Sequence, residues 1–192
     1  MAARAGQLLN LTEVSKECGV SAVTAKRWLS LLESTRIVYL LRPYFKNITK
    51  RAIKSPKLYF TDTGLLAYLL KYPTPETLMA GPQSGAFFEN MIIMEALKHK
   101  FNHGAQYEMY FYQDSNHNET DLIMDYGQKV VLAEMKATKN ITPKLAAFIK
   151  NVPFKNTAAY VVSFSDNEIA LTPQVKAIPW QNFNPARLAD QK

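Results

Sequence analysis

Two short stretches of apolar positions at helical spacing occur between residues 9 and 34. Asn10 or Thr12 can cap a first helix, Gly19 can form the turn after it, and Ser21 can cap a second helix. These signals predict a helix-turn-helix. We expect the first helix to bury Leu11, Val14 and Cys18, and the second helix to bury Val23, Trp28, Leu29 and Leu32.

Two apolar stretches with strand character follow, at residues 37–41 and 57–60, and the segment between them is basic at residues 45–54. A helix-turn-helix followed by a two-stranded hairpin is a winged helix, so we expect the basic segment to form the wing. Thr61 or Asp62 can then cap a short helix at residues 64–71.

The best candidate for a domain boundary is the segment 72–83, which contains three prolines and a glycine. We therefore divide the chain into a winged helix-turn-helix domain at residues 1–76 and a second domain at residues 77–192.

The second domain alternates between helical and strand patterns. The expected elements are a helix at residues 84–101, a strand at 107–112, a hairpin with its turn at Tyr126-Gly127-Gln128, a helix at 141–150 that starts at Thr142 and Pro143, a strand at 157–164, a strand at 175–178 and a polar tail. This order predicts a mixed sheet covered by helices, and so a mixed α/β fold.

The hairpin carries charged residues on both of its strands. Side chains alternate between the two faces of a strand. With the tight turn at Tyr126-Gly127-Gln128, Asp121 lies opposite Glu134, and Glu119 lies opposite Lys136. Opposite side chains are close enough for Asp121 and Glu134 to bind one hard cation together, whereas a register slip of one residue would separate them.

Composition excludes several classes of protein for this chain of 192 residues. No apolar run reaches the roughly 18 residues that span a bilayer, and the first residues lack the apolar core of a signal peptide, so we expect no membrane partner. The single cysteine, Cys18, excludes an internal disulfide and favours a cytoplasmic location. The three histidines are too scattered to favour a zinc site.

The net charge of +7 is unevenly distributed. Residues 1–83 hold twelve basic and five acidic side chains, whereas the rest of the chain holds eleven of each. This asymmetry predicts nucleic acid as a partner, DNA more than RNA, with a solvated basic surface as the alternative. The candidate nucleic-acid-binding residues on the second helix and the wing are Lys26, Arg27, Lys46, Lys50, Arg51 and Lys54.

Four residues of the second domain resemble the active-site motif of the PD-(D/E)xK nuclease superfamily, which has a restriction-endonuclease-like α/β/α core. They are Glu89 on the long helix, Asp121 on one hairpin strand, and Glu134 and Lys136 on the other. The resemblance implies Glu89, Asp121 and Glu134 as ligands of Mg²⁺ or Mn²⁺, and Lys136 as the catalytic residue that orients water or neutralises charge. Glu119 would hold Lys136 in place. The alternative is a surface hairpin with ordinary Glu–Lys pairs.

Most of the chain, residues 5–180, is also similar to the C-terminal region of a family of prokaryotic AAA+-like ATPases, in which a winged helix precedes such a nuclease-like domain. The resemblance implies an upstream ATPase domain as a partner. No GxxxxGK[ST] motif is present, so ATP would bind only on that missing domain. The residues behind the resemblance are Gly6-Gln-Leu-Leu-Asn10, Leu31-Leu32-Glu33, Tyr59-Phe-Thr-Asp-Thr-Gly-Leu65, Phe88-Glu89, Glu119-Thr-Asp121 and Glu134-Met-Lys136.

These patterns leave two functions open. The first is a magnesium-dependent nuclease to which the basic winged helix delivers nucleic acid. The second is a catalytically inactive module that binds DNA or protein for an AAA+-like ATPase, because winged helices also serve as protein-docking modules and a fold does not carry an activity with it.

Overall fold

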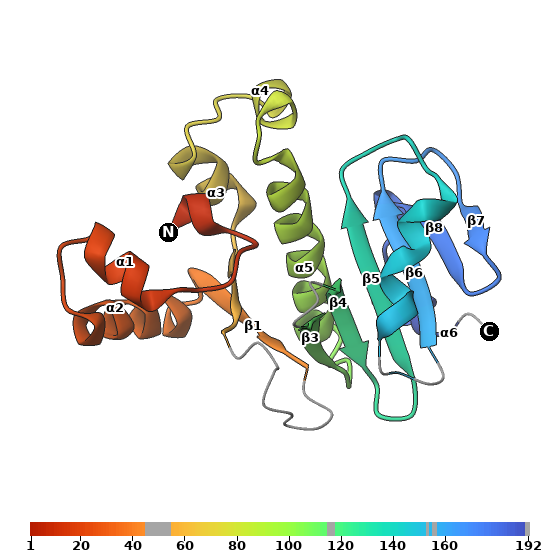
Figure 1. Ribbon diagram of the computed structural model, residues 1–192, viewed down its shortest axis with the longest axis horizontal. Helices are drawn as coiled ribbons and strands as arrows, with labels where there is room; N and C mark the ends of the chain where they lie inside the picture. Colours follow the sequence, from red (N-terminus) through yellow and green to blue (C-terminus); the bar gives the residue numbers. More distant parts are fainter. Residues whose placement is uncertain (45–54, 115–117, 153, 155–156, 191–192) are drawn as a thin grey trace.

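The strands of the chain form one mixed sheet that extends through both of the predicted domains (Figure 1). The computed structural model describes residues 1–44, 55–114, 118–152, 154 and 157–190. Within these residues the sheet has eight strands in the order β2-β1-β3-β4-β5-β6-β8-β7. The strands are β1 (Val38–Pro43), β2 (Lys57–Phe60), β3 (Glu108–Gln113), β4 (Glu119–Asp125), β5 (Val130–Lys136), β6 (Thr157–Ser163), β7 (Ile169–Thr172) and β8 (Val175–Pro179).

Helices lie at one end of this sheet and on both of its faces (Figure 1). The α-helices are α1 (Leu11–Glu17), α2 (Ala22–Ser34), α3 (Thr63–Leu69), α4 (Pro75–Ala80), α5 (Ser84–Asn102) and α6 (Pro185–Asp190). The 3₁₀ helices are η1 (Ala2–Arg4), η2 (Pro143–Asn151) and η3 (Trp180–Asn182). No helix in the described part of the chain is long and apolar enough to cross a membrane.

The two N-terminal helices begin where the sequence predicts them. The side chain of Asn10 accepts hydrogen bonds from the backbone N–H groups of Thr12 and Glu13, which caps α1. Ser21 caps α2, and Gly19 lies in the turn between the helices with a φ of 65°. A positive φ is accessible to glycine at little energetic cost, which explains this residue at this turn.

The predicted buried faces of these two helices are partly wrong. Val23 and Trp28 are 66% and 48% exposed, and Cys18 is also exposed. The buried stripe of α2 passes through Ala25 and Leu29 instead. The reason is that α2 carries apolar residues around more than one face, so spacing alone does not determine which of them turns inward.

The predicted wing hairpin exists as an antiparallel pair, but it belongs to the large sheet. Val38 of β1 pairs with Phe60 of β2. On its other side β1 pairs with β3 in parallel, with Arg42 next to Tyr110. The hairpin therefore forms one end of the sheet and is not a free wing. The segment that we expected to form the wing, residues 45–54, lies outside the described residues.

The predicted linker contains a helix of its own. Thr74 caps α4 in a capping box with Thr77, and Pro75 occupies the first helical position, where a proline is tolerated. Leu78 is buried. The prolines that suggested a linker therefore begin and follow a short helix.

The central hairpin has the predicted register. Asp125 pairs with Val130, and the pairing continues to Leu122 and Ala133. Gly127 lies in the turn with a φ of 85°. The turn is also stabilised by its backbone N–H, which donates a hydrogen bond to Asp125. The expected register of the two strands is thus confirmed over the residues that pair.

Alternating residues of the central strands contribute to two different cores. Leu122 and Met124 pack with residues of α5 and with Leu188 of α6, whereas Ile123 lies in a second core with Ala146 of η2. The sheet is therefore covered by α5 and α6 on one face and by η2 on the other. This is a mixed α/β arrangement with three layers.

Three expectations for the C-terminal part need correction. The predicted helix at residues 141–150 is the 3₁₀ helix η2. Strand β7 was not expected, and it pairs with β8 at the end of the sheet. The polar tail forms η3 and α6, and Leu188 of α6 is only 1% exposed. A helix of six residues, PARLAD, is too short to show the periodicity that would reveal this packing from sequence.

Candidate functional site

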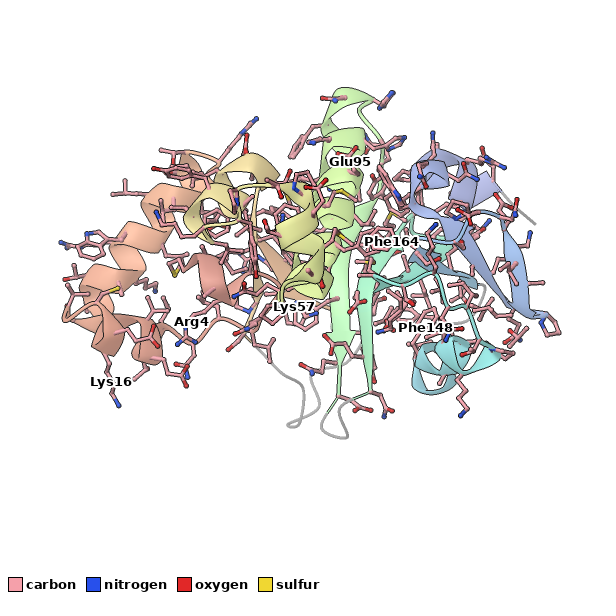
Figure 2. The ribbon with its side chains drawn as sticks, turned by 90° about the horizontal axis from the view of Figure 1, so that it is seen from above. Arg4, Lys16, Lys57, Glu95, Phe148 and Phe164 are labelled. Atoms are coloured by element: carbon pink, nitrogen blue, oxygen red, sulfur yellow. The ribbon has the colours of Figure 1, made fainter. Side chains whose placement is uncertain are left out.

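A buried ionic network lies where β2, α5 and the β4–β5 hairpin meet, with Lys57 at its centre. Figure 2 shows Lys57 at the junction between the N-terminal elements and the central helix and strands. Its Nζ lies 2.9 Å from Oε1 of Glu89, 2.5 Å from Oε1 of Glu119 and 3.8 Å from Oδ1 of Asp121. The lysine is only 4% exposed.

Strand β2 places Lys57 in the interior because all four of its residues are buried. Tyr59 follows two positions later and therefore projects to the same face of the strand. Its hydroxyl donates a hydrogen bond of 2.5 Å to the same Oε1 of Glu89. The ring of Phe111 on β3 lies 5.6 Å from the lysine Nζ, so the ammonium group also has an aromatic neighbour.

Helix α5 is fixed to β2 through Asn90, the residue that follows Glu89. Asn90 is fully buried, and its amide Nδ2 donates to the backbone carbonyl of Phe60 at 2.9 Å. Its Oδ1 accepts from the backbone N–H of Phe60 at 2.8 Å. Asn90 therefore bonds to β2 as a neighbouring strand would, and this contact sets the position of the adjacent Glu89.

The two hairpin strands stop pairing at the site. The last paired residues are Leu122 and Ala133. Beyond them, the backbone N–H of Met135 donates to the carboxylate of Asp121 at 2.8 Å. Asp121 thus takes the place of a backbone partner, which draws its carboxylate toward Glu134 on the neighbouring strand.

Glu134 is buried, and only one of its two carboxylate oxygens has a partner. Its Oε1 forms an ion pair of 2.8 Å with Nζ of Lys136, while its Oε2 has no hydrogen-bond partner. A buried carboxylate oxygen without a partner is costly, and each such atom in a native structure calls for an explanation.

Burial shifts the protonation of these acids. It raises the pKa of Asp121 well above its usual value, and the negative charges of Glu89 and Glu134 raise it further, against the opposing effect of Lys57. Burial also raises the pKa of Glu134, against the opposing effect of Lys136. Additional positive charge at Asp121 and Glu134 would favour the ionised form of both carboxyl groups.

All of the predicted site residues of the second domain belong to this network, but their pairing differs from the expectation. Lys136 forms its ion pair with Glu134, and Glu119 forms its own with Lys57. Across the described ranges, no three His, Cys, Asp or Glu side chains are arranged as a group that could hold a metal ion. Glu89 as a metal ligand therefore stays a prediction.

Lys57 is the residue that sequence reasoning missed. The sequence places it at the first position of the predicted strand 57–60, directly after the basic segment 45–54 and two intervening residues, and no role was assigned to it. The available signal was its position in the strand: Lys57 and Tyr59 alternate with Leu58 and Phe60, and no other charged residue occurs in β2. A single lysine in a short apolar strand points to a buried partner of opposite charge.

The predicted nucleic-acid-binding residues are only partly described. Lys26 and Arg27 are exposed on α2, where they line a shallow cavity of about 710 Å³ together with Val23, Ser30, Leu31 and Ser34. Lys46, Lys50, Arg51 and Lys54 lie outside the described residues.

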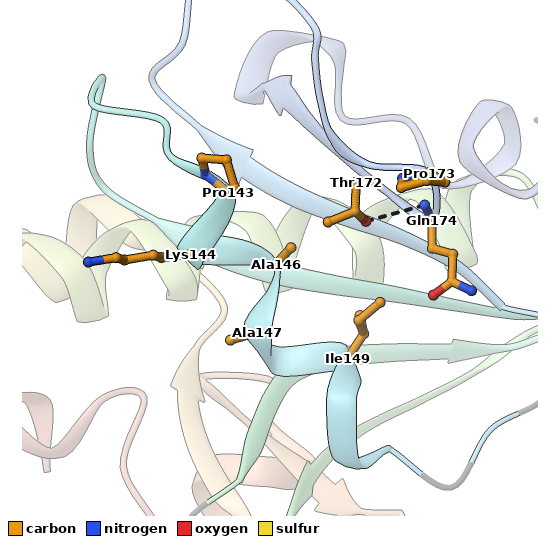
Figure 3. Close-up of a pocket in the computed structure, with 8 residues that line it drawn as sticks. All are labelled: Pro143, Lys144, Ala146, Ala147, Ile149, Thr172, Pro173 and Gln174. Atoms are coloured by element: carbon orange, nitrogen blue, oxygen red, sulfur yellow. Dashed lines mark hydrogen bonds between the residues drawn. The ribbon is translucent and has the colours of Figure 1, made fainter.

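A separate cavity of about 560 Å³ lies between η2 and the turn that connects β7 and β8 (Figure 3). Among the described residues that line it, Lys144 is the only charged one, and the others include Pro143, Ala146 and Ile149. None of the residues of the ionic network contributes to this cavity, so we do not connect it with the site chemistry.

Two family models match the chain, and the boundary between the two matched segments lies at or just after α4. Residues 1–76 match a domain of unknown function, DUF8612, and residues 84–183 match a second one, DUF4143. The chain belongs to the DUF4143 family. Every acidic residue of the network lies in the DUF4143 segment, whereas Lys57 lies in the DUF8612 segment. The site is therefore built from both segments.

Two relatives are uncharacterized proteins of Mycobacterium bovis, Mb2031c, and of Mycobacterium tuberculosis, Rv2008c. Each is 30% identical over 178 residues, which cover 91% of this chain. The chain spans 38% of the length of these relatives. No solved structure matches it significantly.

Proposed function

We propose that this DUF4143 chain is a metal-dependent nuclease domain that hydrolyses phosphodiester bonds and has the restriction-endonuclease-like core of the PD-(D/E)xK superfamily. The observation that carries the proposal is the convergence of Asp121, Glu134 and Lys136 at the point where β4 and β5 separate. The convergence supports the proposal because hydrolysis needs oxygen ligands for a metal ion and a nearby cation for developing negative charge.

The residues present fit Mg²⁺ held by two carboxylates. Mg²⁺ is usually bound by one or two carboxylates, with water and substrate oxygens completing its shell, so a group of three acids is not required. The unpartnered Oε2 of Glu134, on a residue that is only 8% exposed, is an available oxygen ligand. Burial raises the pKa of Asp121, and a bound cation would favour its ionised form. Asp121 and Glu134 would hold the ion.

The other residues have distinct roles in this proposal. A bound Mg²⁺ would supply Lewis-acid polarisation of the phosphate and an acidified water. Lys136, whose side chain is 41% exposed, can reach a phosphate oxygen from the open side of the site and balance the charge that develops there. Glu134 keeps this ammonium close through their ion pair of 2.8 Å. Glu89 and Glu119 hold Lys57.

Nucleic acid is the substrate class that we propose, DNA more than RNA, because the net charge of +7 belongs to the N-terminal segment. The basic residues available for contact include Lys26 and Arg27 on the exposed side of α2. Lys57 is buried and cannot contribute to such a surface. DUF4143 domains are found in AAA-ATPase-associated C-terminal regions, so we also propose an upstream ATPase domain as a partner. The N-terminal segment of this chain would then be a winged helix between the ATPase domain and the nuclease domain.

Plasmid nicking tests this function. Purified protein should nick supercoiled DNA with Mg²⁺ or Mn²⁺ and should be inactive with EDTA. Asp121→Ala and Lys136→Ala should each abolish nicking, whereas Lys139→Ala, an exposed lysine paired with Asp166, should nick like the wild type. Equal nicking by all four proteins would identify a contaminating nuclease. Absence of nicking by the wild type with either metal would contradict the proposal.

A second candidate function, a non-catalytic binding module of an AAA+-like ATPase, is favoured by one observation on α2. Val23, Trp28 and Leu31 are exposed on this helix beside Lys26 and Arg27. Exposed apolar side chains suit a protein contact better than they suit base recognition. Under this function, Val23→Ser and Leu31→Ser would weaken binding to the ATPase part of a full-length relative, while Asp121→Ala would not.

A further inference from the structure

The charge balance of the ionic network depends on a residue outside the DUF4143 segment. Four carboxylates belong to it, those of Glu89, Glu119, Asp121 and Glu134, together with two ammonium groups. With all six groups ionised, two negative charges remain, which is the charge that one divalent cation balances. Without Lys57 the excess would be three negative charges.

The surroundings of the Lys57 ammonium are those of a bound cation. The group donates to carboxylate oxygens from two different elements, α5 and β4, and a third carboxylate lies 3.8 Å away. It is nearly excluded from water, since the residue is 4% exposed. Carboxylate oxygens that converge from separate elements are also the ligands that hard divalent cations select.

We propose that Lys57 is a built-in cation of this site: its ammonium occupies a divalent-cation position between Glu89, Glu119 and Asp121, and it thereby restricts the site to a single metal ion. Lys57 is a positioning residue in this scheme, because it acts on the carboxylates and not on the substrate. The inference rests on the proposed function only for the identity of the remaining ion at Asp121 and Glu134.

The proposal also explains why the predicted triad of metal ligands is incomplete. Oε1 of Glu89 is taken by Lys57 at 2.9 Å and by the hydroxyl of Tyr59 at 2.5 Å. Removal of the ammonium would leave Glu89 and Glu119 without their shared counter-charge. Both carboxylates would then be available to a metal ion, and for Glu89 this is the role that the sequence motif suggests.

Titration calorimetry with Mn²⁺ alone tests the idea in the full chain. The wild type should bind one equivalent. Lys57→Met should bind a second equivalent or bind Mn²⁺ at least tenfold more tightly, and Lys57→Arg, which keeps the charge, should resemble the wild type. Adding Glu89→Gln to Lys57→Met should remove the gain. Lys98→Met, which removes an exposed lysine from α5, is the matched control and should change nothing.

Folding of the neutral variants gives a second measurement. Loss of the ammonium leaves Glu89 and Glu119 without their counter-charge. We therefore expect Lys57→Met and Lys57→Gln to melt at a lower temperature than the wild type without metal, and to gain more thermal stability from Mn²⁺ than the wild type does. A merely structural lysine would give variants that saturating Mn²⁺ does not restore. That result, or folded neutral variants that bind Mn²⁺ with wild-type affinity and stoichiometry, would overturn the inference.

The outcome also separates this inference from the proposed function. A wild type that binds no Mn²⁺, beside a Lys57→Met variant that does, would contradict the metal-dependent nuclease and support the role of Lys57. A wild type that nicks DNA, beside neutral Lys57 variants that gain no metal binding, would support the proposed nuclease and contradict the role of Lys57.

Discussion

Asn90→Ala should destabilise the protein strongly, because its amide links α5 to the backbone of β2 in the protein interior. The residue is fully buried and makes two hydrogen bonds to the backbone of Phe60, at 2.8 and 2.9 Å. Alanine would leave the N–H and the C=O of Phe60 without these partners in the protein interior. Each unsatisfied buried polar group costs about 1–3 kcal/mol, so we expect a loss of about 2–6 kcal/mol.

Urea unfolding followed by circular dichroism measures this loss directly, as a lower midpoint at an unchanged slope. In a protein of this size, each kcal/mol corresponds to about 2–4 °C, so the melting temperature should fall by about 4 °C or more. Asn102→Ala, at the exposed end of the same helix, is the control and should stay within about 0.5 kcal/mol of the wild type. An Asn90→Ala variant as stable as this control would refute the argument that Asn90 holds α5 to β2.

Three further results are expected. Tyr59→Phe removes a hydrogen bond to Glu89 and should lower the free energy of unfolding by about 1–3 kcal/mol in the same urea assay, since this bond is to a charged acceptor. Burial raises the pKa of the Tyr39 hydroxyl to about 12. Between pH 10 and 12 the unfolded chain loses this proton while the folded chain keeps it, so the free energy of unfolding should fall as the pH rises. In thermal melts, Tyr39→Phe should lose less stability over this pH range than the wild type. A fragment of residues 77–192 lacks β1 and β2 and should elute as aggregate or show an unfolded spectrum, and a monomeric folded fragment would contradict this.

The sequence predicts most local features of this fold because each has a local cause. Caps at Asn10 and Ser21 locate the first helices. The glycine in the turn at residues 126–128 fixes the register of the β4–β5 hairpin, since a tight turn allows few pairings. The convergence of Asp121 and Glu134 follows from that register.

The missed features depend on contacts between distant parts of the chain. Whether Trp28 faces inward depends on what packs against α2, and the pattern of α2 does not contain that information. The junction of β1 with β3 joins residues about 70 positions apart. Lys57 could be assigned to the site only with β2 placed beside α5, because no local pattern pairs it with Glu89, 32 positions away.

Lys57 comes from the DUF8612 segment and pairs with acids of the DUF4143 segment, and this has a consequence for how the two segments vary among relatives. Positions 57 and 89 should change together among relatives, because a neutral residue at one leaves an unbalanced charge at the other. The same holds for chimeras: a DUF8612 segment transplanted onto the DUF4143 segment of another relative should give a folded protein only when the two positions match in charge. Two segments that family models treat as separate are thus coupled in this chain through the ion pair between Lys57 and Glu89.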